Sequence, residues 1–314
     1  MTAQSAGSAG SAGSAGSALG ELAGRFALHR PKLFAIAHRT LGSPWSADDA
    51  LQEVWIRLQR ADNLEIDNLD AWLTTVVSRV CIDMIRQQAS RREDHDDLDA
   101  PLERAVAGAT DATDPAHRAM RSDDLALAMQ VILETLGPLE RLALVLHDVF
   151  ALSYDDIAPI VERSPVAARQ LASRARARVR TVDVTTVRAR HEVAIAAFLD
   201  AAREGDFARL LQLLDPEIEV RSDATAVRTS AAGAAQGAPL LADRVLGADA
   251  VARVFVGRAA LTRPVVVGGV PSAAYITADG VKAFYLVGFE AERIVRIDVL
   301  ADTDHLSLWT FDRS

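Results

Sequence analysis

The sequence is poor in the residues that build disulfides, metal sites and membrane spans. Its 314 residues include one cysteine, Cys81, so no internal disulfide is expected, which fits a reducing compartment. The seven histidines are scattered, and none shows HxxxH or HExxH spacing. No apolar run reaches 18 residues, and no basic segment followed by an apolar stretch opens the chain. We therefore expect no metal, no cofactor, no membrane span and no ordinary secretory signal.

Composition and charge divide the chain unevenly. Half of the residues are apolar and a quarter are charged, so the chain can bury cores, and its length predicts two or three domains. Residues 5–16 repeat Ser-Ala-Gly four times, which predicts a flexible tether. Residues 93–124 contain ten acids and three arginines but few large apolar residues, which predicts a flexible acidic linker.

The net charge of −9 is reversed locally between Arg163 and Arg180. This stretch of 18 residues contains six arginines and no acid. Ser164 is a good N-cap, and Pro165 stands where the first helical turn tolerates proline. The run that follows is rich in alanine and has no glycine, so a helix of about four turns is predicted.

Two further helices are predicted before this basic one, over residues 139–150 and 153–161. Ser153 can cap the second of them, with Asp156 three residues on, and residues 162 and 163 leave room for only a tight turn. A short helix followed by a tight turn and a basic helix is the helix-turn-helix arrangement, which lays its second helix in the major groove of DNA. The alternative is a solvated arginine-rich helix face without DNA.

Three amphipathic helices are predicted before the acidic linker, over residues 25–41, 47–58 and 71–88, with a polar loop over 61–70. The polar side of the second helix carries Asp48, Asp49, Gln52 and Glu53. Its apolar side carries Leu51, Trp55 and Leu58. In the third helix, Arg79 and Arg86 are expected to face outward.

These two blocks resemble a known family. DDALQEVW, followed by NLDAWLTTVVSRVCIDMIR, resembles region 2 of the extracytoplasmic-function sigma factors, a branch of the sigma-70 family. LGPLERLALVLHDVFALSYDDIAPIVERSPVAARQLASRARARVR is similar to their region 4. The resemblance implies two all-α domains, core RNA polymerase and promoter DNA as partners, and a cytoplasmic location. It implies no catalytic residue in these blocks.

The resemblance also implies roles for residues of the first block. The face formed by Asp48, Asp49, Gln52 and Glu53 matches the one that binds the largest polymerase subunits. The loop from Asn63 to Asp70 matches the one that captures a flipped base of the −10 element. The implied −10 contacts are Asn63, Asn68, Asp70, Arg79 and Arg86. Arg79 departs from the asparagine that many relatives carry, and Trp72 is expected in the core rather than as a stacking platform.

In the second block, the resemblance implies contacts to the −35 element. Arg169, Ser173 and Arg174 match positions that contact base edges or phosphates, and an arginine paired with guanine is the commonest specific contact. Arg176, Arg178 and Arg180 are expected to contact backbone phosphate or solvent. The full set of implied −35 contacts is Arg163, Ser164, Arg169, Gln170, Ser173, Arg174, Arg176 and Arg178.

About 130 residues follow the basic helix. Helices are predicted over 187–203, 207–214 and 248–260, a long loop over 222–242, and strands over 218–221, 265–267, 273–277, 281–290 and 293–300. Asp279-Gly280 is a hairpin signal. AAFLDAAREGDFARLLQLLDPEIEVRSD and RIVRIDVLAD resemble the SnoaL-like cone, an α+β fold with a curled antiparallel sheet. This resemblance implies an extension that modulates a sigma factor in cis rather than acting as an enzyme.

Cone folds carry a pocket, which leaves catalysis or ligand binding open. The candidate acid–base residues are Asp223, Tyr275, Tyr285 and Asp298, and the alternation of Asp298 with apolar residues allows it to point into the cone, while His305 lies past the last strand. An unknown small molecule in the pocket stays an alternative. The second hypothesis for the whole chain is a cone-fold enzyme or ligand receptor fused to DNA-binding helices.

The domains predicted from the sequence follow one another along the chain. A flexible tail over 1–20 precedes a region 2 helical bundle over 21–92 and an acidic linker over 93–123. A region 4 helix-turn-helix domain is predicted over 124–183, and a SnoaL-like regulatory domain over 184–314.

Overall fold

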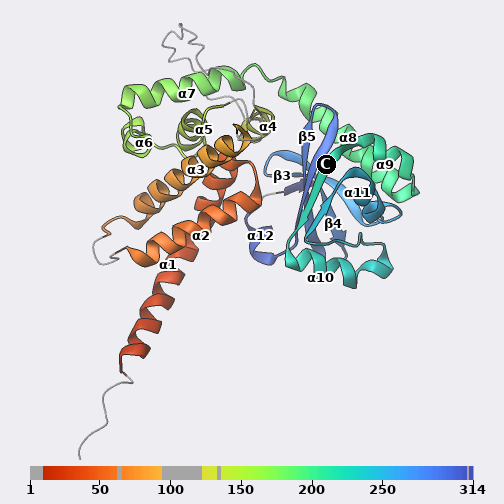
Figure 1. The fold of residues 1–314 in the computed structure, drawn as a ribbon, viewed down its shortest axis with the longest axis horizontal. Coiled ribbons are helices and arrows are strands. Elements are labelled where there is room, and N and C mark those ends of the chain that lie inside the picture. The colour runs from red at the N-terminus through yellow and green to blue at the C-terminus, as the bar shows by residue number, and fades with distance from the viewer. Residues whose placement is uncertain (1–9, 62–65, 94–121, 133–135, 310, 314) are drawn as a thin grey trace, which may run out of the picture. The chain divides into compact units, whose positions relative to one another are not determined.

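The computed structural model describes residues 10–61, 66–93, 122–132, 136–309 and 311–313 (Figure 1). The chain divides into two compact units, one comprising Met1–Ala105 and Gly137–Ala172 and the other Val106–Leu136 and Ser173–Ser314. The sequence predicts one domain over 124–183, whereas these residues are shared between the two units. The acidic linker lies almost wholly outside the described residues.

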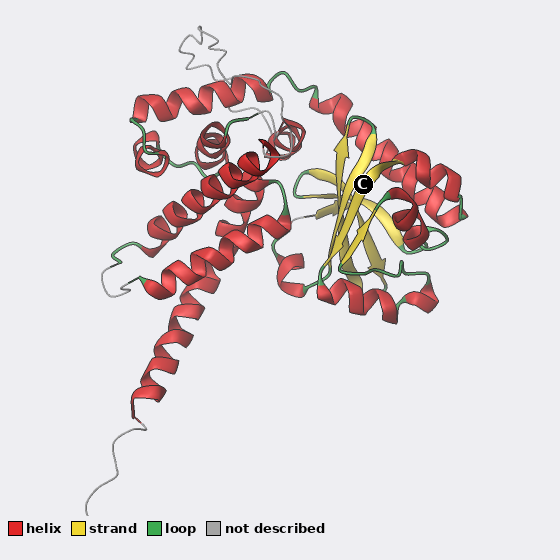
Figure 2. Ribbon diagram, viewed as in Figure 1, coloured by secondary structure: helices red, strands yellow, loops and turns green. Residues whose placement is uncertain are grey.

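Three long helices begin the first unit: α1 (Gly10–Leu41), α2 (Pro44–Arg60) and α3 (Leu69–Glu93) (Figure 2). The sequence predicts a flexible tether over the Ser-Ala-Gly repeats, but α1 begins at Gly10, inside them. Alanine is the strongest helix former, and extending an existing helix needs no new nucleus. The helix predicted from Arg25 therefore continues toward the N-terminus through the repeats.

The first unit continues with α5 (Pro138–Leu144), the π-helical turn η4 (Val145–Val149), α6 (Tyr154–Val161) and the start of α7 (Pro165–Val179). The residues of α7 from Ser173 onward belong to the second unit. These elements confirm the helices predicted over 139–150, 153–161 and 164–180 to within a few residues.

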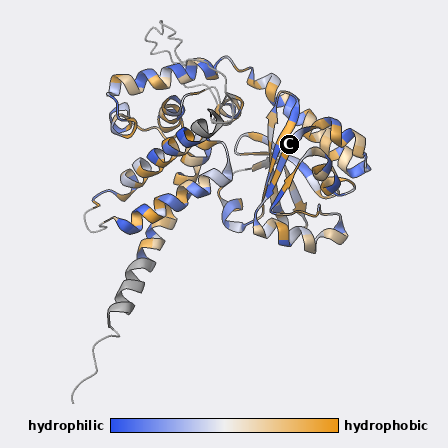
Figure 3. Cartoon of the chain, in the orientation of Figure 1, coloured by the Kyte–Doolittle hydropathy of each residue, from blue (hydrophilic) through white to orange (hydrophobic). Residues whose placement is uncertain are grey.

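Apolar periodicity explains why these helices pack. The buried residues of α2 recur every three or four positions: Pro44, Ala47, Ala50, Leu51, Val54 and Leu58. Hydrophobic and hydrophilic residues follow one another along α2 and α7 (Figure 3). In α7 the buried positions are Ala168, Ala172, Ala175 and Val179. Alanine at three of these positions lets the neighbouring backbone approach closely and leaves the arginines to the other faces.

The second unit contains α4 (Ser122–Ile132) and a C-terminal α+β domain. The helices of this domain are α8 (Val184–Glu204), α9 (Phe207–Leu213), α10 (Ala224–Ala232), the 3₁₀ turn η5 (Ala234–Gln236), α11 (Ala248–Phe255) and α12 (Thr303–Ser307). Its strands are β1 (Leu214–Ser222), β2 (Arg244–Leu246), β3 (Thr262–Val267), β4 (Val270–Thr277), β5 (Gly280–Glu290), β6 (Arg293–Leu300) and β7 (Phe311–Arg313). Aspartate side chains cap α8, α9, α10 and α12, from Asp183, Asp206, Asp223 and Asp302.

The strands form one mixed sheet in the order β2-β1-β6-β5-β4-β3-β7. The sequence predicts an antiparallel sheet, but β1 and β6 pair in parallel, with Val220 opposite Ile297. The other neighbouring strands are antiparallel. A parallel pair needs a long crossover, and the chain between β1 and β6 supplies it.

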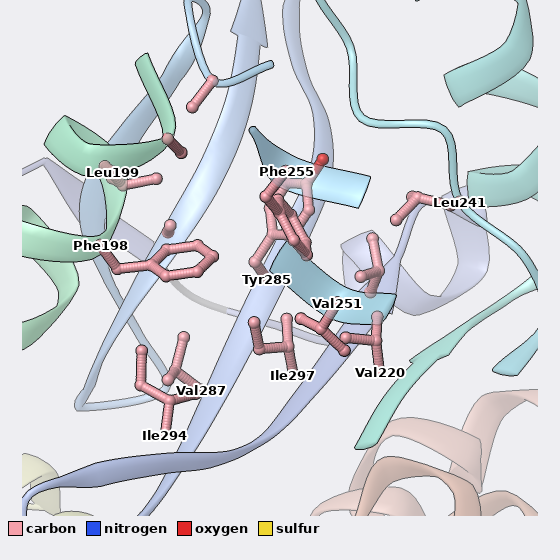
Figure 4. Packing of buried hydrophobic residues seen from close by; sticks show 14 of the residues in the cluster. Phe198, Leu199, Val220, Leu241, Val251, Phe255, Tyr285, Val287, Ile294 and Ile297 are labelled. Atoms are coloured by element: carbon pink, nitrogen blue, oxygen red, sulfur yellow. The ribbon is translucent and has the colours of Figure 1, made fainter. Parts of the chain in front are cut away.

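Alternation along the strands divides the sheet into two apolar faces. One face packs against α8, α9 and α11, and Figure 4 shows the Phe198 ring pointing toward Phe255 and Tyr285. The ring centroids of Phe198 and Phe255 lie 5.2 Å apart, edge to face. The other face carries a smaller cluster around Phe284, against which Leu306 and Trp309 pack.

Several predictions for this domain need correction. Residues 222–242 are not one long loop, because α10 occupies Ala224–Ala232. Asp223 caps this alanine-rich segment by accepting a hydrogen bond from the Ala226 N–H, which gives the helix a start. The hairpin turn uses Ala278 and Asp279, with Gly280 at φ 105° beginning β5. The short strands β2 and β7 were not predicted. None of the described helices is long and apolar enough to cross a membrane.

Candidate nucleic-acid and polymerase interfaces

A capped turn joins α6 to α7. At the start of α6, Ser153 Oγ accepts a hydrogen bond from the Asp156 N–H over 3.1 Å. Glu162 ends the helix in the left-handed conformation, with φ 56° and ψ 46°. Ser164 Oγ then accepts from the Ala167 N–H over 3.2 Å and starts α7. The caps predicted at Ser153 and Ser164 are confirmed, and the geometry is that of a helix-turn-helix.

The arginines of this motif lie away from its buried alanine stripe. Six of the predicted −35 residues are exposed: Arg163, Ser164, Arg169, Gln170, Arg174 and Arg178. Ser173 and Arg176 are half-buried. The Arg169 guanidinium carbon lies 5.3 Å from the centroid of the Tyr154 ring, which itself stacks on His147 with 4.1 Å between ring centroids. This cation–π contact orients Arg169 without using its N–H donors.

On α2, basic neighbours partly neutralise the negative charge of the predicted polymerase face. Asp49 and Gln52 are exposed. Asp48 Oδ1 lies 3.4 Å from Arg30 Nη2, and Glu53 Oε1 lies 2.9 Å from Arg57 Nε. The outward polar groups of this face are therefore concentrated at Asp49 and Gln52.

Some of the predicted −10 residues make contacts within the protein itself. Asn63 lies outside the described residues. Asn68 Oδ1 accepts a hydrogen bond from the Ala71 N–H over 3.0 Å and caps α3. Asp70 lies 2.7 Å from Lys32 Nζ and 3.3 Å from His29 Nδ1. The Lys32 hydrogen bond outweighs partial burial and lowers the pKa of Asp70. Asn68 and Asp70 thus fix the start of α3, and Trp72 is half-buried beside them.

Arg79 and Arg86 occur two turns apart on α3, and both are exposed. Arg79 Nη2 donates a hydrogen bond to the Pro159 carbonyl of α6 over 3.3 Å and lies 3.9 Å from Glu162 Oε1. Sequence patterns give no sign of this partner, because it lies 80 positions away in the chain. They give no sign either that Arg141, a charged residue in an apolar run, is buried.

The C-terminal domain encloses a small apolar cavity of about 20 Å³ beside Phe198, Phe255 and Tyr285. Burial, reinforced by the neighbouring Tyr275, raises the pKa of the Tyr285 hydroxyl, so it stays neutral. Asp298, a candidate for the interior of the cone, does not point into this cavity. Its neighbours Ile297 and Val299 belong to the core, so Asp298 faces the other side of the sheet, where its Oδ2 lies 3.0 Å from Arg296 Nε.

Asp223 and His305, the other acid and imidazole considered for catalysis, lie near one another. His305 Nδ1 is 3.7 Å from Asp223 Oδ2, and the same oxygen accepts hydrogen bonds from the backbone N–H groups of Ala301 and Asp302. Among the described residues, no group of three or more His, Cys, Asp or Glu side chains could hold a metal ion. Cys81 is a buried core residue, and this burial raises the pKa of its thiol to about 12.

A helical bundle followed by a helix-turn-helix is the arrangement of a DNA-binding transcription protein, and comparison with known proteins agrees with it. The Sigma-70 region 2 family matches residues 26–91, and the Sigma-70 region 4 family matches residues 126–179. The probable ECF RNA polymerase sigma factor SigI of Mycobacterium tuberculosis is 37% identical over 198 residues, covering 62% of this chain and 68% of SigI.

A second relative covers more of the chain. The ECF RNA polymerase sigma factor SigJ of Mycobacterium tuberculosis is 35% identical over 226 residues, which is 71% of each chain. The crystal structure of SigJ matches with a TM-score of 0.41 and 28% identity, covering 91% of this chain and 98% of SigJ. This chain belongs to the family of extracytoplasmic-function RNA polymerase sigma factors.

Proposed function

We propose that this chain recruits core RNA polymerase to a specific set of promoters, recognising the −35 element through α7 and the −10 element through the loop before α3 and α3 itself. The observation that carries the proposal is the capped turn between α6 and α7, followed by exposed arginines on a helix whose alanine stripe is buried. Such a helix fits the major groove. Because core RNA polymerase works in the cytoplasm, the proposal locates the chain there.

At the −35 element, Arg169, Ser173 and Arg174 are the proposed base-contacting residues. Arg169 is already oriented by Tyr154, which reduces the conformational entropy that it loses on binding DNA. Arg163, Ser164, Gln170, Arg176 and Arg178 complete the proposed surface. Guanidinium groups near the helix ends are suited to phosphate, which gives affinity without sequence information.

At the −10 element, we assign Asn63, Asn68, Asp70, Arg79 and Arg86. Asn68 and Asp70 also stabilise the start of α3, so we assign them chiefly to holding the loop in position. Arg79 and Arg86 are exposed donors for bases or phosphates.

For core polymerase, Asp49 and Gln52 are the proposed central contacts, with Asp48 and Glu53 at the margin. Asp49 and Gln52 are exposed, whereas Asp48 and Glu53 have arginine partners of their own. An acidic, amide-bearing face suits a partner surface rich in arginine.

We further propose that the C-terminal domain modulates this activity in cis. Its support is α4, whose residues from 126 onward fall within the region 4 match but which packs on α8 and β4 of the C-terminal domain. Arg188 Nη2 lies 3.1 Å from Asp124 Oδ1, and Arg188 Nη1 donates to the Gly269 carbonyl. Gln130 Nε2 donates to the Val287 carbonyl over 3.3 Å. The domain therefore holds the beginning of the region 4 segment.

We assign no catalytic role to this domain. A cavity of about 20 Å³ has room for about one water molecule, and its lining is almost entirely apolar. Asp223 is engaged by backbone N–H groups, and Asp298 lies on the other face of the sheet. A cone-fold enzyme or small-molecule receptor stays the second hypothesis.

Run-off transcription with purified core polymerase tests the proposal, using Asp49→Lys with Glu292→Lys as a control. Both substitutions reverse an exposed acid, and Glu292 lies in the turn between β5 and β6. We expect at least tenfold less transcript from Asp49→Lys, unchanged promoter binding by the free chain, and full activity from Glu292→Lys. Full activity from Asp49→Lys would favour an ordinary transcription regulator, which needs no polymerase face.

Arg188→Ala tests the modulation in the same assay, with the exposed Arg190→Ala as its control on the same helix. Loss of the Arg188 contacts should free α4 and change transcript yield at least threefold in either direction. Equal yields from both variants and the unmodified chain would contradict a role for the α4 contact.

A further inference from the structure

The outward face of α7 has an uncharged centre. The buried side of the helix is formed by Ala168, Ala172 and Ala175. Successive residues of a helix are rotated by about 100°, so Val166 lies roughly opposite this buried side, with Gln170 about 40° from it. Val166 is 67% exposed. An apolar side chain therefore stands in the middle of the face that α7 turns away from its own core.

Arginines flank Val166 on both sides of this face. Arg169 is rotated from Val166 by about 60° in one direction, and Arg174 by about 80° in the other. Both arginines are exposed. Their long side chains can contact phosphates or guanine to either side of the helix, which leaves the base edges directly beneath it to the shorter side chains between them. When α7 enters a major groove, Val166 therefore meets a base edge.

The stability of α7 does not explain a valine at this position. Val166 is the second residue of the helix, after Pro165, and β-branched residues are weaker helix formers than alanine. A single exposed valine needs no explanation on an ordinary surface. In a helix-turn-helix, however, the N-terminal residues of the second helix are the ones that contact base edges. The place of Val166 in the motif, rather than its exposure alone, indicates a role in recognition.

The chemistry of valine restricts what it can recognise. Its side chain neither donates nor accepts a hydrogen bond. The apolar group that a base displays in the major groove is the C5-methyl of thymine, whereas the other positions present N–H donors or N7, O4 and O6 acceptors. Valine against those polar positions would displace water without replacing its hydrogen bonds, which costs free energy. Valine against the methyl group buries apolar surface of both partners.

We propose that Val166 is a specificity-determining residue of α7 that packs against the C5-methyl group of a thymine in the −35 element. The inference rests on the proposed function in requiring that α7 enters the major groove. It adds a requirement for thymine, which arginine does not supply, because the specific partner of an arginine is guanine.

Replacing thymine with deoxyuridine tests the contact, because uracil lacks the methyl group but keeps the hydrogen-bonding pattern. The probes are DNA duplexes that the full chain selects from random sequences, once with core polymerase and once without it. Each thymine of the selected −35 sequence is replaced singly, on either strand, and binding is measured. At one position, loss of the methyl should weaken binding about three- to fivefold, as expected for one buried methyl group.

Variants of Val166 connect that methyl group to this side chain. Val166→Ala should bind the thymine duplex about three- to fivefold more weakly and no longer distinguish thymine from uracil at that position. Alanine is the stronger helix former, so this loss cannot come from unfolding of α7. Val166→Thr keeps one methyl group and should discriminate better than Val166→Ala. The matched control is Val193→Ala in α8, which truncates a valine that is 69% exposed and should leave discrimination unchanged.

The outcomes separate this inference from the proposed function. Equal binding of thymine and uracil duplexes at every position would overturn the inference, as would full discrimination by Val166→Ala. Val166-dependent discrimination in a chain that binds its duplex without core polymerase and starts no transcription would leave the inference standing and reject the sigma function. Absence of sequence-specific binding under both conditions would overturn both.

Discussion

The carboxylate of Asp223 accepts a hydrogen bond from the backbone N–H of Ala301 over 2.7 Å, although the residues lie 78 positions apart. The same side chain accepts from the Ala226 N–H at the start of α10 and from the Asp302 N–H at the start of α12. One buried carboxylate therefore joins the end of β6 to two helix starts.

The pH dependence of this connection follows from the pKa of Asp223. Burial by itself would raise this pKa, but His305 and the backbone N–H groups of Asp302, Ala226 and Ala301 outweigh it and lower the pKa to about 2. The unfolded value is near 3.9, so stabilisation of about 2 kcal/mol is complete above about pH 4 and is lost as the pH falls through 2. Asp223→Asn should remove it at pH 7.

Hydrogen exchange of the β1 and β6 amides during urea titration measures this effect. The exposed Asp279→Asn is the control and should leave exchange unchanged. If the Asp223→Asn variant and the unmodified chain differed equally at pH 7 and pH 2, the carboxylate charge would not be the stabilising group.

His191 gives a pH dependence of the same sign at higher pH. Its ring stacks on Phe289 with 4.0 Å between centroids, and burial lowers its pKa to about 4. The unfolded state, with a pKa near 6.5, binds more protons between these values, so stability falls as the pH drops from 6.5 to 4, by up to about 3 kcal/mol. His191→Phe keeps the stack, fills the space and removes the titration.

Denaturation of the C-terminal domain at pH 7 and pH 5 checks this prediction. His191→Phe should lose less stability between the two pH values than the unmodified chain does. His38→Phe, the same substitution in the first unit, should not alter this difference. Identical pH dependence in His191→Phe would mean that another group titrates.

The helices were predictable because local signals specify them. Ser153 and Ser164 cap α6 and α7 through hydrogen bonds to residues three positions away. The spacing of apolar residues in α2 identifies its buried face. The helix-turn-helix, the α2 acid face and the arginine surface of α7 all depend on such short-range patterns. Sequence reasoning is strong where both partners of a contact lie within one or two helical turns.

Long-range contacts were not predictable from the same patterns. Arg141 lies in an apolar run, and only its partner Thr40, 101 positions away, explains why a charge is buried there. Asp298 alternates with apolar residues, a pattern that fits either face of a strand, and its face could not be assigned from the sequence because both faces of this sheet are apolar. The parallel pairing of β1 with β6 likewise depends on sheet order rather than on either strand.

Substitution of Tyr285 tests whether the cavity has a catalytic or ligand-binding role. Its hydroxyl is the polar group expected of an acid–base site there, and burial raises its pKa. Because we assign no catalysis to the cavity, Tyr285→Phe should leave run-off transcription within twofold of the unmodified chain. Phe255→Ala, which removes a buried ring from the same cavity, should cost about 3–5 kcal/mol of domain stability. Loss of activity in a stable Tyr285→Phe variant would point to ligand binding.

Arg169 and Arg178 should differ in what their loss does to DNA binding. Arg169 lies in the first half of α7 and is oriented by Tyr154, so Arg169→Ala should cost about 1–3 kcal/mol on the preferred −35 sequence and little on altered ones. Arg178 lies in the last turn, so Arg178→Ala should weaken all sequences alike and reduce the magnitude of the salt slope by about 1.

Binding of the polymerase complex to matched and mismatched promoters at several salt concentrations separates these roles. Tyr154→Leu serves as a second probe, because it removes the ring beneath Arg169 but keeps an apolar residue at the start of α6. It should weaken specific binding less than Arg169→Ala does. Equal losses from Arg169→Ala on every sequence would show that Arg169 contacts phosphate, and sequence recognition would then pass to Ser173 and Arg174.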